Sequence, residues 1–142
     1  MKLTSIIPVS VDSVPEQMEP GILYISEEND VVMHLCCCGC GQEVVTPLSP
    51  AEWSIRRSGN AVTLRPSIGN GDYACRSHYW ITNNQVEWDG PMSKKQIAIV
   101  KERDRIDKQR YIDHVNAEKL KKVDSDLWSV IRNLFNKVKS WF

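Results

Sequence analysis

Four of the five cysteines lie within five consecutive residues, Cys36-Cys-Cys-Gly-Cys40, and the fifth is Cys75. Near neighbours in a chain have poor geometry for a disulfide, and an odd number of cysteines cannot all pair. The first residues, Met1 to Val14, lack the basic region and long apolar run of a secretory signal, so we expect a cytoplasmic chain with reduced thiols. Thiols clustered in this way favour a tetrahedral Zn²⁺ site, which supplies folding free energy to a small domain.

The spacing within the cluster indicates which thiols face the metal. On an extended strand, alternate residues point to the same side, which separates Cys37 from its cysteine neighbours. The predicted zinc ligands are therefore Cys36, Cys38, Cys40 and Cys75. In a rival set, His78 replaces one of the sulfurs. A Rieske iron–sulfur cluster is disfavoured because its histidine and cysteine would here come in reversed order, as His34 and then Cys36.

Charge is distributed unevenly along the chain and marks a boundary. The 142 residues carry 18 basic and 18 acidic side chains, but segment 1–93 has 5 basic and 11 acidic residues, whereas segment 94–142 has 13 and 7. Every Cys, Gly and Pro also lies before Ser93. We predict a cysteine-rich zinc-binding β domain at 1–92 and a basic helical extension at 93–142. The zero net charge gives no indication of a specific nucleic-acid partner, and no apolar run is long enough to span a membrane.

Short segments rich in β-forming residues fill the first region. They are Gly21–Ser26, Val31–Leu35, Val44–Thr46, Trp53–Ile55, Ala61–Leu64, His78–Ile81 and Gln85–Trp88. Turn-forming residues separate the last two pairs of segments, Ser58-Gly59-Asn60 in one case and Thr82-Asn83-Asn84 in the other, which indicates two hairpins. Short strands with turns at this spacing predict a mainly β fold, a small antiparallel sandwich or barrel, with the tryptophans in its core.

The second region has the pattern of a helix. Ser93 is a favourable N-cap, and no Gly or Pro interrupts Lys94–Lys122, although a weak apolar seam suggests breaks or fraying. A sharper amphipathic helix is expected after a second N-cap at Ser125 or Asp126. Its apolar side would hold Leu127, Trp128, Val130, Ile131, Leu134, Phe135, Val138, Trp141 and Phe142.

This final amphipathic helix is basic, because no acidic residue follows Asp126. Three occupants of its apolar face stay open at this point. Most amphipathic helices cover the core of their own domain. The face can instead contact a partner protein or a second copy of the chain, or its cations and aromatic side chains can bind an anionic membrane surface.

Several motifs of the β region resemble those of one bacterial family. They are His34-Leu-Cys-Cys-Cys-Gly-Cys-Gly41, Val44-Val-Thr-Pro-Leu-Ser-Pro50 with Trp53, Pro66-Ser-Ile-Gly-Asn70, and Cys75-Arg-Ser-His-Tyr-Trp-Ile81 with Val86-Glu-Trp88. Their ordered series resembles a cysteine-rich family of bacterial ubiquitination-like (Bub) operons. Its genes typically lie beside ubiquitin-like, ubiquitin-activating-like and ubiquitin-conjugating-like genes. The resemblance covers roughly Gly21 to Trp88 and excludes the basic extension.

The resemblance implies a serine-type peptidase that processes or removes a ubiquitin-like modifier, in the manner of a deubiquitinase. It implies that the modifier and its conjugation enzymes are the partners, in a cytoplasmic pathway of antiphage defence. A second hypothesis assigns no catalysis to the chain. In this case the β domain is a zinc module that docks the modifier or its enzymes.

Two serine–histidine pairs are candidates for the catalytic residues. If the two cysteine-bearing strands pair antiparallel, His34 falls opposite Ser77. Alternatively Ser67, in a glycine-containing turn whose amides form an oxyanion hole, meets His78. Asp72 is the nearest acidic candidate to orient the histidine, and no Gly-x-Ser-x-Gly motif is present. Both histidines can instead be metal ligands or supports of the metal site, and a zinc-bound water would be an alternative nucleophile if one coordination position were open.

Overall fold

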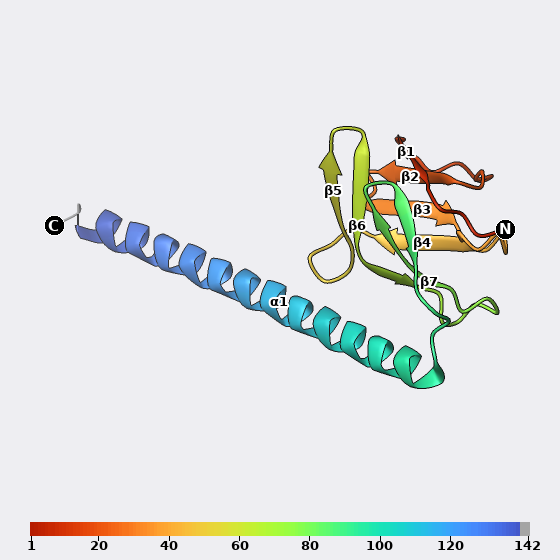
Figure 1. The fold of residues 1–142 in the computed structure, drawn as a ribbon. Coiled ribbons are helices and arrows are strands. Elements are labelled where there is room, and N and C mark those ends of the chain that lie inside the picture. Colours follow the sequence, from red (N-terminus) through yellow and green to blue (C-terminus); the bar gives the residue numbers. More distant parts are fainter. Residues whose placement is uncertain (140–142) are drawn as a thin grey trace. The chain divides into compact units, whose positions relative to one another are not determined.

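Within residues 1–139, which the structure describes, the chain forms two four-stranded β-sheets and one long helix in a computed structural model (Figure 1). The predicted mainly β fold with a C-terminal helix is confirmed. The two sheets do not close into a barrel, so the sandwich is the arrangement that fits. The chain divides into two compact units, Met1–Asp104 and Arg105–Phe142. Two residues of the predicted apolar face, Trp141 and Phe142, lie outside the described residues.

The first sheet has the strand order β1-β2-β3-β4. Its strands are β1 (Ile7–Ser10), β2 (Ile22–Ser26), β3 (Val31–Leu35) and β4 (Glu43–Pro47). β2, β3 and β4 pair antiparallel, as predicted, whereas β1 pairs parallel with β2. β1 is not among the predicted strands. Proline is unfavourable within a strand, and β1 contains Pro8. Two parallel strands are also not joined by a tight turn, so no turn motif marks this pair in the sequence.

The second sheet is antiparallel throughout, in the order β5-β6-β7-β8. Its strands are β5 (Ser54–Ser58), β6 (Ala61–Gly69), β7 (His78–Thr82) and β8 (Gln85–Trp88). Both predicted hairpins form. Asn83 and Asn84 make the tight turn between β7 and β8 with φ of 47° and 65°, a conformation that asparagine tolerates better than most residues. β6 extends further than predicted, so Ser67 lies within a strand and not in a turn.

Side chains from both sheets meet in one hydrophobic core. Val32 of the first sheet and Leu64 and Ile81 of the second are fully excluded from solvent. Complete burial of an aliphatic side chain contributes about 1.5–3 kcal/mol to folding. Trp53 and Trp88 pack against this core but stay partly exposed, so the prediction of core tryptophans is only approximate.

Helix α1 spans Lys94–Lys139 and begins directly after the predicted N-cap. Ser93 and Gln96 form a reciprocal capping box, because the Gln96 amide donates to Ser93 Oγ (3.2 Å) and the Ser93 amide donates to Gln96 Oε1 (2.8 Å). The predicted second N-cap at Ser125 or Asp126 is wrong. The helix continues through this position, and the Ser125 hydroxyl donates to the backbone carbonyl three residues earlier (2.8 Å).

The first turns of α1 belong to the β-rich unit. Ile97 lies so close to Gly71 that a Cβ atom at the glycine would be 2.7 Å from Ile97 Cγ1. Lys101 forms an ion pair with Asp72 at 2.6 Å. In the described part of the chain, no helix combines the length and the apolar character needed to cross a membrane.

Candidate metal centre and active site

Four sulfur atoms meet where the β3–β4 connection approaches the β6–β7 connection. The Sγ atoms of Cys36, Cys38, Cys40 and Cys75 all lie within 4.8 Å of one another. The Sγ–Sγ distance is 3.4 Å from Cys36 to Cys38, 3.8 Å from Cys40 to Cys75 and 4.0 Å from Cys36 to Cys75. A disulfide requires about 2.05 Å. Four sulfurs bound at about 2.3 Å to a tetrahedral Zn²⁺ lie about 3.8 Å apart, so the spacing fits this ion.

Two glycines fold the β3–β4 connection so that its sulfurs converge. Gly39 and Gly41 have φ of 89° and 80°, which residues with a Cβ atom rarely adopt. The Gly39 amide donates to the Cys36 carbonyl (3.0 Å), and the Cys36 amide donates to the Gln42 carbonyl (2.8 Å). Because the chain turns back on itself within seven residues, three thiols separated by single residues reach one point.

The surroundings of the cluster change the pKa values of three of its thiols, Cys38, Cys40 and Cys75. Burial, together with hydrogen bonds among the thiols, raises the pKa of Cys38 to about 12, and burial also raises the pKa of Cys40. Burial acts to raise the pKa of Cys75 as well, but hydrogen bonds from Ser77 and from neighbouring thiols outweigh it and lower this pKa to about 7. Four thiolates this close repel one another, and a divalent cation is the group that stabilises them together.

Two buried polar side chains contact the cluster. Ser77 Oγ lies 3.1 Å from Cys36 Sγ and 3.4 Å from Cys75 Sγ. Asn70 Nδ2 donates to Cys36 Sγ (3.4 Å) and to Ser77 Oγ (2.9 Å). Ser77 therefore lies beside the sulfurs and not beside a histidine ring that could remove its proton.

His34 and Cys37 point into the core, away from the four-sulfur cluster. Both are fully buried, and His34 Nε2 lies 2.8 Å from the Tyr79 hydroxyl. Burial lowers the pKa of His34 to about 4 and raises that of Cys37 to about 12, so both are neutral near pH 7. β3 and β7 belong to different sheets, so the strand pairing that would place His34 opposite Ser77 does not form.

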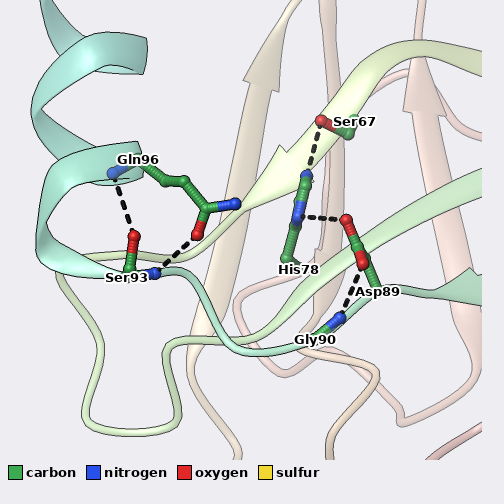
Figure 2. Close-up of polar contacts among 6 residues, drawn as sticks. All are labelled: Ser67, His78, Asp89, Gly90, Ser93 and Gln96. Carbon is green, nitrogen blue, oxygen red and sulfur yellow. Dashed lines mark hydrogen bonds and ion pairs between the residues drawn. The ribbon is translucent and has the colours of Figure 1, made fainter.

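The second predicted pair, Ser67 and His78, is in hydrogen-bond contact. His78 Nε2 lies 2.9 Å from Ser67 Oγ, and His78 Nδ1 lies 3.2 Å from Asp89 Oδ2 (Figure 2). The other oxygen of Asp89 accepts the Gly90 amide at 2.8 Å, which fixes the carboxylate. With Nδ1–H donating to the carboxylate, Nε2 is free to accept the serine proton. Both ring nitrogens of His78 are occupied in this way, which leaves neither for the metal as in the rival ligand set.

The β7–β8 hairpin places Asp89 beside His78. Tyr79 pairs with Trp88 in this hairpin, so the residues one step further out, His78 and Asp89, lie opposite each other. The Asp89 amide donates to the His78 carbonyl at 2.9 Å. The carboxylate is thus positioned by the antiparallel register, at the point where β8 ends.

A β-bulge in β6 places Ser67 on the other side of His78. Leu64 pairs with Ile81 and Ile68 with Tyr79, so the three residues at 65–67 lie opposite a single residue of β7. Such a bulge redirects the side chains that it contains. Ser67 lies within hydrogen-bond distance of the imidazole as a result.

Asp72, the predicted orienting group, has another partner. Its carboxylate forms the ion pair with Lys101, and Asp89 is the carboxylate beside His78 Nδ1. The sequence contained a signal for Asp89. If Asn83 and Asn84 are taken as a two-residue hairpin turn, the antiparallel register alone pairs residue 78 with residue 89.

The candidate active site is partly open to solvent. The His78 side chain is 15% exposed and that of Asp89 is 50% exposed. The Trp80 ring lies 4.9 Å from the His78 ring, centroid to centroid, and restricts the imidazole on one side. A small cavity of about 50 Å³ borders two cysteines of the cluster as well as His78 and Asp89. Its lining residues are Lys2, Cys38, Cys75, Ser77, His78, Trp88, Asp89 and Pro91.

Residues 10–89 match a protein family described as the bacterial ubiquitination-like system serine protease, BubE. This span is more than half of the chain and includes the four clustered cysteines. The chain belongs to the BubE family. The BubE match also includes Ser67, His78 and Asp89, whereas helix α1 follows it. The family resemblance expected from the sequence motifs is thereby confirmed.

Neither a curated protein nor a solved structure matches the chain. The BubE family description names a serine protease and a ubiquitination-like system, and it assigns no individual residues.

Proposed function

We propose that this BubE-family chain is a serine-type peptidase that processes or removes a ubiquitin-like modifier. Ser67 is the nucleophile, His78 the general base and Asp89 the group that orients the imidazole. The observation that carries this proposal is the continuous series of contacts from Ser67 Oγ through His78 to the Asp89 carboxylate. A serine nucleophile, an adjacent base and a group that orients the base form the Ser-His-Asp arrangement found in many serine proteases.

The proposed reaction proceeds through an acyl-enzyme. Ser67 Oγ attacks the carbonyl carbon of the scissile bond while His78 Nε2 accepts the hydroxyl proton, and Asp89 stabilises the resulting imidazolium through Nδ1–H. The imidazolium then gives its proton to the leaving amine, and the acyl group stays on Ser67 as an ester. A water molecule, deprotonated by the same imidazole, hydrolyses the ester and regenerates the serine.

We assign Zn²⁺ to the four-cysteine cluster, with a structural role. Four thiolate ligands would fill the coordination shell of this ion and would leave no position for a reactive water. The metal would join the β3–β4 connection to the β6–β7 connection and so stabilise the fold. Native mass spectrometry of the full chain before and after chelation should give two masses that differ by one zinc ion. A protein without bound metal would contradict this assignment.

The family description, which names a ubiquitination-like system, supports a substrate of this class. The proposed partners are the ubiquitin-like modifier and the enzymes that conjugate it. The substrate would be either a modifier precursor or a modifier attached to a target protein. The free, closely spaced thiols favour a reducing compartment such as the cytoplasm.

The experiment that tests the proposal combines cleavage with active-site labelling. The zinc-loaded full chain is incubated with a modifier precursor that carries a C-terminal extension, and separately with a fluorophosphonate that acylates activated serines. We expect cleavage and labelling of Ser67, and we expect Ser67→Ala to lower the cleavage rate by at least about 10³-fold. Ser58→Ala, an exposed serine on β5, is the matched control and should retain the wild-type rate.

Two results would contradict this proposal. One is the absence of both cleavage and labelling in the zinc-loaded wild type. If that protein still bound the modifier, the noncatalytic docking module would be the correct function. The other is cleavage by Ser67→Ala at the wild-type rate, which would assign the reaction to other residues.

A further inference from the structure

The segment that joins the two proposed catalytic strands also contributes to the cysteine cluster. β6 carries Ser67 and ends at Gly69, and β7 begins with His78. The eight residues between the two strands include Cys75. Any movement of this connection relative to the other three cysteines therefore acts on the strand ends next to both proposed catalytic residues.

Asn70 and Ser77 close this connection at its base. The Asn70 amide donates to the Ser77 carbonyl at 2.9 Å, and the Asn70 side chain donates to Ser77 Oγ at the same distance. The two residues are 8% and 6% exposed, so these hydrogen bonds are shielded from water. The base of the connection is thus fixed immediately before His78.

The same two side chains reach the sulfurs. Both contact Cys36 Sγ, which comes from the β3–β4 connection, at 3.4 Å from Asn70 Nδ2 and 3.1 Å from Ser77 Oγ. Ser77 Oγ also lies 3.4 Å from Cys75 Sγ. The small cavity is lined by Cys75 and Ser77 together with His78. Ser77 therefore contacts the sulfurs through its side chain and directly precedes His78, the first residue of β7, in the chain.

We infer that Asn70 and Ser77 are positioning residues that couple metal binding at the four cysteines to the alignment of His78 with Ser67. The metal does not touch the substrate, yet its occupancy controls the peptidase. With the metal bound, Cys36 and Cys75 are held together, and the hydrogen bonds of Asn70 and Ser77 keep the start of β7 in register with β6. This inference rests on the proposed peptidase function and adds a means of regulating it.

The physical basis is the precision that acyl transfer requires. A serine and its base must stay within hydrogen-bond reach, and a misplacement of about 1 Å can cost about 10²-fold in rate. Polar residues that surround metal ligands commonly contribute about 10–100-fold in metal affinity or activity. Ser77 has a buried hydroxyl that contacts two of the sulfurs, and it directly precedes the proposed base, His78. Its loss is therefore expected to affect both the metal site and the position of the base.

The test compares Ser77→Ala with Ser77→Thr in the zinc-loaded full chain. Alanine removes the hydroxyl, whereas threonine retains it. We expect Ser77→Ala to lower kcat by about 10–100-fold with little change in KM, and to weaken zinc binding by a similar factor in competition with a chromogenic chelator. Ser77→Thr should recover most of both losses. Ser58→Ala again serves as the control on an exposed serine.

A second measurement uses the wild-type chain without substitution. Fluorophosphonate labelling of Ser67 should slow at least about 10-fold after chelation and return when zinc is added back. Circular dichroism recorded on the same samples reports whether the strands persist. If the strands are lost on chelation, the kcat of Ser77→Ala at saturating zinc tests the coupling instead.

The outcomes separate this inference from the proposed function. If the zinc-loaded wild type neither cleaves nor labels, the proposed function fails. If it is active and Ser77→Ala at saturating zinc retains the wild-type kcat, the coupling is wrong while the peptidase stands. A chelated, folded chain that labels at the wild-type rate would overturn the coupling in the same way.

Discussion

The β-rich unit, Met1–Asp104, and the helical unit, Arg105–Phe142, differ in what stabilises them. In the β-rich unit, Leu64 and Ile81 are completely excluded from solvent. In the helical unit, Leu134 and Phe135 are 58% and 67% exposed. None of the described residues of α1 is buried. The β-rich unit is held by tertiary packing, whereas the helix is held by its own backbone hydrogen bonds and side-chain pairs.

This difference explains where chemistry can be placed. Catalytic and metal-binding groups must be held at fixed distances, and only elements fixed by several neighbours provide such positions. All residues of the proposed active site and metal centre lie in the β-rich unit. An exposed apolar helix face is available for contact with another molecule, but it does not hold chemical groups at fixed distances.

After the loss of Ser67 itself, the largest effect is expected when the charge that orients His78 is removed. Asp89→Asn preserves size but replaces the carboxylate next to Nδ1, so the imidazole can adopt the wrong tautomer. We expect a loss of about 10²–10⁴-fold in kcat, measured on a modifier precursor. Asp72→Asn is the matched control, because Asp72 belongs to the same unit and pairs with Lys101. Equal activities of the two variants would show that Asp89 has no orienting role.

The sequence contained most of the proposed metal centre but only part of the proposed active site. The four thiols were selected by the alternation of an extended strand, and the same four gather in the structure. The reason is different, because β3 ends at Leu35 and the sulfurs converge through a turn that contains Gly39 and Gly41. Asp89 was missed because the turn was predicted as three residues, Thr82-Asn83-Asn84, which pairs residue 78 with Trp88. The two-residue turn of the structure shifts the register by one and pairs it with Asp89. Ser67 was assigned to a turn because the bulge that redirects it follows from the pairing of β6 with β7.

The fold shows the same division between local and non-local information. The capping box at Ser93 and the two hairpin turns are local, and all of them could be identified from neighbouring residues. The parallel pairing of β1 with β2 joins segments separated by a long connection, and no short pattern indicates it. Ser125 had the composition of an N-cap, but the helix already present on its N-terminal side continues through it.

A smaller effect, on stability alone, distinguishes the two units directly. Ile81→Ala in the core should lower the free energy of unfolding by about 2–5 kcal/mol, because it removes buried methyl groups and leaves a cavity. Leu134→Ala on the helix should change it by less than about 0.5 kcal/mol, because the side chain is already exposed and alanine is a good helix former. Urea unfolding of the zinc-loaded chain measures both. Comparable losses would show that the helix is packed in a stable contact.

The smallest effect on activity and stability is expected for the exposed apolar face of α1, which requires a different measurement. Phe135→Ser should leave the cleavage rate and the unfolding free energy unchanged. The helix carries Arg132, Lys137 and Lys139 but no acidic residue after Asp126, and this charge complements anionic lipid headgroups. We therefore expect the full chain to co-sediment with phosphatidylserine vesicles, and Phe135→Ser to reduce this binding several-fold. Asn136→Ser, on the polar side, is the control.

Competing occupants of this face give different results in the same experiment. A second copy of the chain would produce a concentration-dependent dimer in sedimentation velocity, and Phe135→Ser would dissociate it without any effect of lipid. Electrostatic binding to lipid weakens as salt rises, whereas an apolar contact between helices does not. Binding to neutral and anionic vesicles at two salt concentrations therefore separates the contributions of the basic and the apolar residues. If neither vesicles nor a second copy binds, the face is available to the conjugation enzymes that the proposed function names as partners.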